Sequence, residues 1–247
     1  MAHLLIDPQL GPHALAGVAG ALGDEVVVRP ASPVRTPVGA LQAESELDEL
    51  LNGGASWGSV VGFGHGASVA AGLVAAGRAE SAVLVDPPHI VAGDRELAAA
   101  HRADRSGERL TRGVAALPPG AMDADPRGPF PDAFYLAAAI QLTDDPRLQA
   151  EYARVWRAAE EERQPYDLGL GLQPRDPERL NWLSTWKRPD LDTTVWLSQD
   201  RDAFARALRA RAPGRPLVEQ PWGALVWLFA PEQLASALAT VLGHKPG

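Results

Sequence analysis

The residues best placed to do chemistry directly follow short apolar runs. His65 comes just after the run at residues 60–63, and Asp86 and His89 come after the run at residues 82–85. An imidazole titrates near neutral pH, and a neighbouring carboxylate can share or direct its proton. The sequence therefore predicts His65, His89 and Asp86 as acid–base groups. The alternatives are a turn residue for His65, a solvated hinge for His89 and a loop-entry cap for Asp86.

Apolar runs alternate with helical patterns, which predicts a mostly parallel sheet of about six strands with helices on both faces. The predicted strands span residues 3–7, 25–28, 59–62, 82–86, 194–198 and 217–218. Right-handed crossovers bring the carboxyl ends of such strands to one edge of the sheet, where ligands bind. Four further candidate ligand-binding residues lie in or next to the loops at that edge: Asp7, Gln9, Phe63 and Gly64.

Helical patterns replace this alternation in the middle of the chain. They occur near residues 96–114, 131–142, 146–163 and 176–186. We expect a helical cap at residues 91–190, inserted into a core made of residues 1–90 and 191–247. Trp182 and Trp186, one helical turn apart, are predicted with Trp222 to line a pocket for an apolar or peptide-like ligand. Packing inside the cap is the alternative for the cap tryptophans.

The composition argues against several classes of partner. A net charge of -8 and a pI near 5.2 argue against a nucleic-acid or anionic-membrane surface. No run approaches the roughly 20 apolar residues of a membrane span, and the first residues lack the basic start of a signal peptide. We expect a cytoplasmic protein, and the Ala, Arg, Pro and Gly bias favours a bacterial source. Monomer and dimer remain open.

No metal or cofactor is predicted. The chain has no cysteine, and its histidines lack the i, i+4 spacing of a helical metal site. Gly64 and Gly66 do not complete a dinucleotide-binding fingerprint, because Val69 stands where its last glycine would be.

The stretch around His65 resembles the α/β-hydrolase superfamily. The nucleophile elbow of that family reads Gly-x-nucleophile-x-Gly, and Gly62, Gly64 and Gly66 occupy its three fixed positions. Gly64 therefore stands in the place of the nucleophile and offers no attacking side chain. The resemblance implies the family's sheet and its cap over the pocket.

Other family positions are altered as well. The resemblance places the acid at Asp200 or Asp202, but the place of the catalytic histidine holds Gly223 and Ala224, and no histidine occurs between His101 and His244. The usual His-Gly oxyanion stretch reads Asp7-Pro8-Gln9, and a carboxylate there opposes a developing oxyanion. Ordinary Ser-His-Asp hydrolysis is therefore not expected.

Three functions follow from this resemblance. The first is a non-hydrolytic isomerase or epimerase that moves an α-proton on a peptide-like or apolar natural-product intermediate, similar to the peptide epimerase of the bottromycin pathway. The second is a ligand-binding protein without catalysis, similar to the N-myc downstream-regulated proteins. The third is a hydrolase with relocated residues such as Ser68 and His89.

Overall fold

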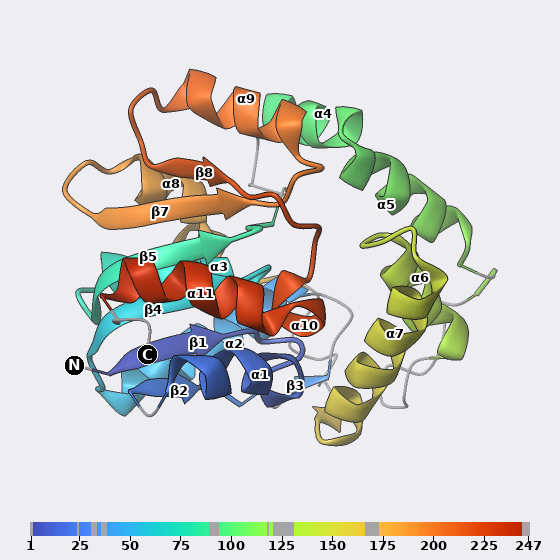
Figure 1. Cartoon of the computed structure of the whole chain (residues 1–247), viewed down its shortest axis with the longest axis horizontal. Coiled ribbons are helices and arrows are strands. Elements are labelled where there is room, and N and C mark those ends of the chain that lie inside the picture. Colours follow the sequence, from blue (N-terminus) through green and yellow to red (C-terminus); the bar gives the residue numbers. More distant parts are fainter. Residues whose placement is uncertain are drawn as a thin grey trace.

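The computed structural model describes residues 2–23, 25–30, 34–35, 39–88, 94–117, 119–120, 131–165 and 173–243. At its centre is a parallel sheet of six strands (Figure 1). The strands are β1 (His3–Ile6), β2 (Val26–Val28), β4 (Trp57–Phe63), β5 (Ala79–Val85), β7 (Asp192–Leu197) and β8 (Leu217–Glu219). Their order is β2-β1-β4-β5-β7-β8, so the predicted parallel sheet is confirmed.

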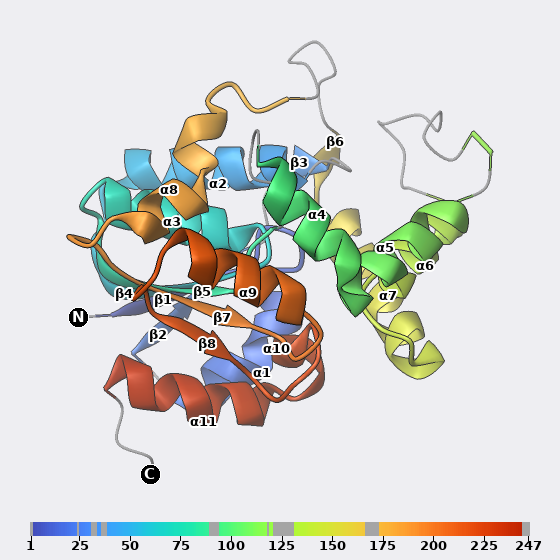
Figure 2. The same cartoon turned by 90° about the horizontal axis from the view of Figure 1, so that it is seen from above.

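Helices cover both faces of the sheet (Figure 2). One face carries α1 (Pro12–Leu22), α10 (Val226–Phe229) and α11 (Pro231–Leu242). The other carries α2 (Gly39–Gly53), α3 (Gly66–Ala75), the short helix η2 (Pro177–Leu180), α8 (Trp182–Lys187) and α9 (Asp202–Arg211), with α4 (Arg95–Ala103) packed on α9. Successive strand side chains point to opposite faces. In β1, Leu4 and Ile6 therefore enter one core cluster and Leu5 enters the other.

Three further helices lie beyond the carboxyl edge of the sheet, at the right of Figure 1. They are α5 (Arg105–Ala115), α6 (Asp132–Ile140) and α7 (Pro146–Glu161), and they pack against one another in that order. We call them the cap helices. A two-residue strand pair, β3 (Val34–Arg35) with β6 (Gln164–Pro165), was not expected from the sequence.

The helical pattern at residues 96–114 forms two helices instead of one. The chain turns at Asp104, whose backbone is extended. Its carboxylate accepts hydrogen bonds from the Ala203 and Phe204 N–H groups, so it caps α9 and ties the α4–α5 junction to the core.

The predicted positions of Trp182 and Trp186 at the ligand pocket are wrong. Helix α8 packs against α3, and the two indoles are 1% and 0% exposed. Their N–H groups donate to the carbonyl oxygens of Pro88 and Pro216, each at 3.0 Å. A helix buried in the core has the same apolar spacing as a helix lining a pocket, which is why the pattern misled.

None of the helices in the described ranges is long and apolar enough to span a membrane.

Candidate functional site

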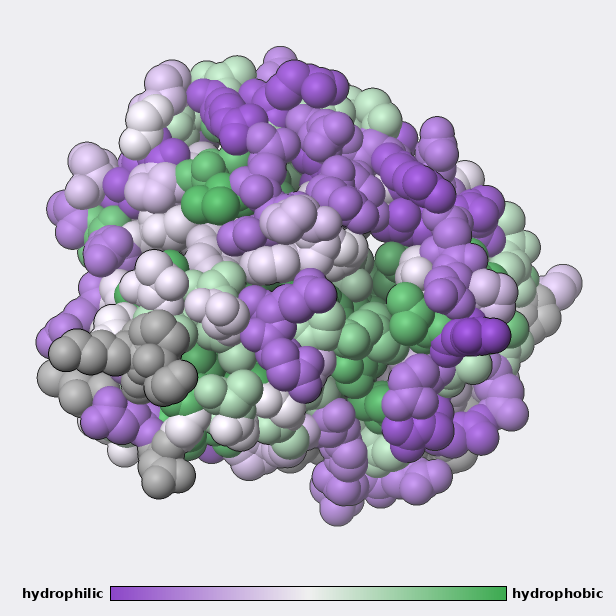
Figure 3. All heavy atoms as spheres, viewed as in Figure 1, coloured by the Kyte–Doolittle hydropathy of each residue, from purple (hydrophilic) through white to green (hydrophobic). Residues whose placement is uncertain are grey.

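Two adjoining hollows lie between the carboxyl edge of the sheet and the cap helices. The inner one is a cavity of about 360 Å³, and the outer one is an open groove of about 960 Å³. Apolar side chains gather in a hollow between α10 and the cap helices α6 and α7 (Figure 3), where Leu142, Val226 and Phe229 line the groove. The two hollows meet at an ion pair between Arg109 of α5 and Asp200, which follows β7.

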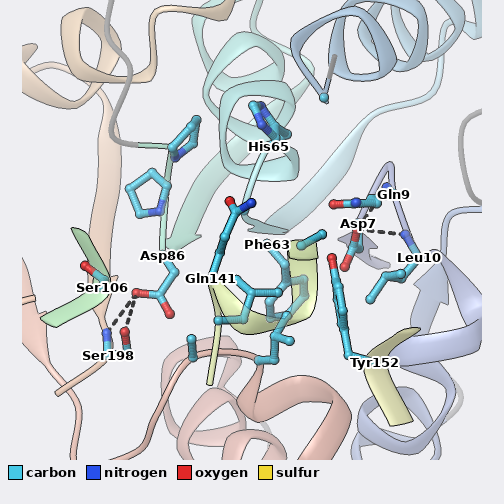
Figure 4. Close-up of a pocket in the computed structure, with 18 of the residues that line it drawn as sticks. Asp7, Gln9, Leu10, Phe63, His65, Asp86, Ser106, Gln141, Tyr152 and Ser198 are labelled. Atoms are coloured by element: carbon cyan, nitrogen blue, oxygen red, sulfur yellow. Dashed lines mark hydrogen bonds between the residues drawn. The ribbon is translucent and has the colours of Figure 1, made fainter. Parts of the chain in front are cut away.

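The elbow after β4 forms the wall of the cavity as predicted, with Phe63, Gly64 and His65 all lining it (Figure 4). A Cβ on Gly62 would overlap the Gly66 carbonyl, and one on Gly66 would overlap the Ile6 carbonyl. Glycine is therefore required where α3 approaches the sheet. Gly64 has φ +54 and open space around its Cα, so the nucleophile position faces the cavity without a side chain.

His65 places its imidazole between the cavity and α2, where the ring lies directly against Gly39. Burial lowers the pKa of His65 to about 4, so the ring is neutral at physiological pH. No hydrogen-bond partner of the ring is found among the described residues. A neutral imidazole with such a low pKa is a poor base, but it can donate a hydrogen bond through one of its nitrogens.

Asp86 holds its carboxylate at the opposite side of the elbow, after β5. One oxygen, Oδ1, accepts hydrogen bonds from the Ser198 N–H at 2.8 Å and the Ser198 hydroxyl at 3.1 Å, and it lies 3.6 Å from an Arg201 nitrogen. The other oxygen, Oδ2, is buried and has no hydrogen-bond partner in the described part of the chain. Burial raises the pKa of Asp86. Asp86 lines the cavity, and Figure 4 shows its carboxylate beside Ser198. Its unpartnered oxygen suits a proton acceptor.

Asp7 also lines the cavity, but hydrogen bonds within the protein occupy both of its oxygens. Oδ1 accepts from the N–H groups of Gln9 at 2.9 Å and Leu10 at 3.0 Å, and Oδ2 accepts from the Trp227 indole at 3.0 Å. Burial raises the pKa of Asp7, and these hydrogen bonds oppose the rise. Asp7 therefore shapes the loop that follows β1, and Gln9 lies at the cavity with it.

Backbone strain also concentrates at the cavity. Among the described residues, two that are not glycine have a positive φ, Asp86 at 45 and Leu225 at 62. Both line the cavity, and Leu225 follows the Ala224 that stands in the family histidine's place. Such strained residues cluster at functional sites.

The cap helices contribute polar groups that the sequence did not single out. Tyr152 of α7 is 4% exposed and lines the cavity, and the Gln141 side chain reaches toward the middle of the site (Figure 4). The Ser106 hydroxyl lies 3.3 Å from His101 Nδ1, and both residues line the cavity. Tyr152 lies within the helical pattern predicted at residues 146–163, and nothing in such a pattern separates a cavity residue from a core residue.

Not every predicted site residue reaches the cavity. Trp222 borders the outer groove, where its ring lies 6.2 Å from that of Trp196, and Trp182 and Trp186 lie in the core. His89 lies outside the described residues. Within the described ranges no three His, Asp or Glu side chains gather as metal ligands would.

Comparison with solved structures identifies the fold. No family model and no curated protein sequence matches this chain. A mutant haloalkane dehalogenase DatA from Agrobacterium tumefaciens C58 matches with a TM-score of 0.59 and 14% identity, over 98% of this chain and 89% of that one. An extracellular α/β-hydrolase from a Paenibacillus species matches with a TM-score of 0.57 and 12% identity, over 97% and 98%.

A third solved structure, an α/β-hydrolase family protein from Desulfitobacterium hafniense, has a TM-score of 0.52 and 15% identity and covers 98% of this chain and 95% of its own. At such low identity these matches establish the fold and not the activity. The chain therefore has the α/β-hydrolase fold.

Proposed function

We propose that this protein binds a carbonyl compound in the inner cavity and moves the proton on the carbon beside the carbonyl, without hydrolysing the compound. It would act as an epimerase or isomerase. The observation that carries the proposal is Asp86 Oδ2, a buried carboxylate oxygen that has no partner among the described residues and belongs to a residue that lines the cavity. A buried polar group without a partner is destabilising, so its retention favours a role toward a ligand.

In this mechanism Asp86 is the base. Oδ1 is fixed by Ser198, which leaves Oδ2 to accept the proton from the substrate carbon. Burial raises the pKa of Asp86 and so makes it a stronger base than an exposed carboxylate. The electron pair of the broken C–H bond moves toward the carbonyl oxygen and forms an enolate.

The enolate oxygen needs hydrogen-bond donors, and the elbow offers them. Helix α3 begins at Gly66, and the first N–H groups of a helix attract negative charge. The neutral ring of His65, next to this helix start, can donate a hydrogen bond without carrying a charge. We therefore assign His65 the role of hydrogen-bond donor to the carbonyl, and assign the role of base to Asp86.

Hydrolysis by the usual mechanism is disfavoured at three positions. Gly64 cannot attack a carbonyl carbon, and Ala224 cannot accept a proton. The Gln9 and Leu10 N–H groups, in the loop where the family carries its oxyanion stretch, already donate to the Asp7 carboxylate. A carboxylate held at that point would repel a developing oxyanion.

The lining of the cavity favours an apolar, peptide-like substrate. Phe63, Leu10, Leu142 and Trp227 form much of its wall. The outer groove shares Leu142 and Ala224 with the cavity and adds further apolar side chains, so a ligand larger than the cavity can extend into it. These features suit a natural-product intermediate such as a modified peptide.

The test begins with ligand capture from an extract of the source cells, read by native mass spectrometry. Any retained compound is then incubated with the protein in D₂O. We expect deuterium at the carbon beside a carbonyl, in a reaction that needs the protein and that Asp86→Asn abolishes. A compound that binds and returns without exchange would instead support the ligand-binding alternative. Labelling of a serine by a fluorophosphonate would support a hydrolase with relocated residues.

A further inference from the structure

We propose that Tyr152 is the second proton carrier of the cavity, and that the substrate is an uncharged carbonyl compound whose adjacent stereocentre is inverted. This inference rests on the proposed function, in which Asp86 removes the proton. It adds the residue that returns a proton, the face from which the proton comes and the charge of the substrate.

The two groups come from different parts of the fold and face the same cavity. Asp86 follows β5 of the sheet, whereas Tyr152 lies on α7 of the cap. Figure 4 shows them on opposite sides of the site, with Phe63 and Gln141 between them. Tyr152 is 4% exposed, and its hydroxyl has no hydrogen-bond partner among the described residues.

Packing fixes the Tyr152 ring in this position. Its centroid lies 5.7 Å from that of Trp156, which also packs against Phe134 at 5.5 Å. The Trp156 indole donates to Glu160 at 3.1 Å, and Glu160 pairs with Arg163, which donates to the Pro8 carbonyl at 3.0 Å. A chain of contacts therefore connects Tyr152 to the loop after β1. These contacts hold the ring at the cavity, and none of them uses the hydroxyl.

The chemistry of the two groups is complementary. Burial and the nearby Asp7 raise the pKa of Tyr152, so its hydroxyl stays protonated and serves as a donor, while the ionised Asp86 serves as an acceptor. Asp86 takes the proton from one face of the substrate carbon and leaves an enolate. The carbon then takes the Tyr152 proton on its opposite face, which inverts the centre. Water returns a proton to the phenolate, and Asp86 releases its own proton to water.

The cations at the cavity indicate an uncharged substrate. Among the described lining residues the arginines are Arg109 and Arg201. Arg109 pairs with Asp200, and Arg201 lies 3.6 Å from Asp86 and donates to the Pro87 carbonyl. Each guanidinium group already lies beside a protein carboxylate, Asp200 or Asp86, so a substrate carboxylate would compete with that group for the positive charge. An amide, ester or thioester therefore fits better than a free amino acid.

The experiment uses N-acetyl-L-phenylalanine methylamide and the matching S-ethyl thioester as probes, with free N-acetyl-L-phenylalanine as the charged comparison. Each is incubated in D₂O, and chirality and deuterium content are measured in the early phase. We expect inversion of the uncharged probes, with deuterium in the inverted product ahead of the recovered starting compound. The charged compound should react at least tenfold more slowly.

Variants separate the roles of the two groups. Tyr152→Phe should invert the probes about 100-fold more slowly or worse. It should still exchange the proton that faces Asp86. Asp86→Asn should lose both reactions. Tyr135→Phe removes a buried phenol hydroxyl from the same aromatic cluster but away from the cavity, and it should behave like the wild type.

The possible failures are distinguishable. No exchange of either uncharged probe by the wild type would overturn the proposed function. Exchange without inversion, or full inversion by Tyr152→Phe, would overturn the role of Tyr152 and leave the role of Asp86 standing. Equal turnover of the charged compound would overturn the inferred substrate charge. The label distribution in the wild type tests the two-sided mechanism even if Tyr152→Phe fails to fold.

Discussion

At the scale of single residues, the polar groups around the cavity divide by whether the protein itself satisfies them. Asp7 makes three hydrogen bonds to neighbouring segments and Ser198 joins Asp86 to Asp200, so these groups maintain the walls. Asp86 Oδ2 and the Tyr152 hydroxyl have no such partner among the described residues. For Asp86 Oδ2, which is buried, the lack of a partner costs about 1–3 kcal/mol. Stability alone does not explain the arrangement.

Asp86→Asn should therefore stabilise the protein while it removes activity. Burial raises the pKa of Asp86, which means that the ionised carboxylate is disfavoured in the folded state at neutral pH. The variant removes this charge, keeps an oxygen to accept from Ser198, and tolerates the φ of 45 better. We expect the free energy of unfolding, measured in urea at pH 7.5, to be higher by roughly 0.5–2 kcal/mol. Lower stability would mean that the Arg201 contact outweighs the desolvation.

His65 should make the protein less stable as the pH falls. Its pKa is about 4 in the folded chain against 6.5 ordinarily, so between these values the unfolded chain binds a proton that the folded chain does not. Stability is unaffected above pH 6.5 and declines as the pH falls toward 4. Between pH 7 and pH 4.5 the loss attributable to this group is about 2 kcal/mol.

The comparison with His65→Gln isolates this effect. Asp7 and Asp86 have raised pKa values and act in the opposite direction, because the folded chain binds protons there before the unfolded chain does. Their contribution is common to both proteins and cancels in the difference. Urea unfolding at a series of pH values should show a steeper decline for the wild type. Parallel curves would place His65 in water instead of in the cavity wall.

At the scale of elements, α7 is the helix whose placement matters most for the site. Arg163, just beyond its end, forms an ion pair with Glu160 in which both side chains are 1% exposed, and it reaches the carbonyls of Pro8 and Gln9. This pair therefore joins the cap to the loop after β1. Removing one member leaves a buried charge without this partner.

Arg163→Met should lower the free energy of unfolding by roughly 3–5 kcal/mol, and the double variant with Glu160→Gln should recover part of the loss. The matched control is Arg154→Met on the same helix, which breaks the solvent-exposed pair with Glu151 and should leave stability unchanged. Denaturant titrations of the four proteins measure this. Equal effects of the two single substitutions would show that the Arg163 pair does not anchor α7.

The elements that the sequence predicted well are those with a local cause. Parallel strands are buried on both faces, so they appear as short apolar runs, and Gly62 and Gly66 mark the place where α3 meets the sheet. Right-handed crossovers between parallel strands then predict that Asp7, Phe63, His65 and Asp86 lie at one edge of the sheet. The catalytic roles of His65 and Asp86 remain predictions.

The elements that the sequence predicted poorly are helices whose partners are distant in the chain. Tyr152 and Trp182 both lie on apolar helix faces, yet one faces the cavity and the other the core beneath α3. Periodicity gives the face that is buried but not what buries it. For the same reason the sequence did not identify Gln141 as a cavity residue. Its position at the cavity depends on how the cap helices pack against the sheet.

At the scale of the whole molecule, the cap and the sheet share one apolar core. Phe134, Tyr152 and Trp156 of the cap belong to the same buried cluster as Phe63 and Trp227 beside the elbow. The ring of Phe63 lies 5.0 Å from that of Trp227. Polar contacts reinforce this cluster through the Arg109–Asp200 pair and through the Asp104 cap of α9.

We therefore expect the cap and the core to unfold together. Far-ultraviolet circular dichroism and tryptophan fluorescence should give one coincident transition in urea, because tryptophans occur on α7 in the cap and on α8 and α10 beside the sheet. Asp104→Ala removes the cap of α9 and the connection to the α4–α5 junction. It should lower the free energy of unfolding by roughly 0.5–2 kcal/mol and leave a single transition. A second transition, with Trp156 reporting the earlier step, would show that the cap opens independently. The cavity would then be assembled only after the ligand had entered, and the positions of Tyr152 and Asp86 would be set by the ligand and not by the fold.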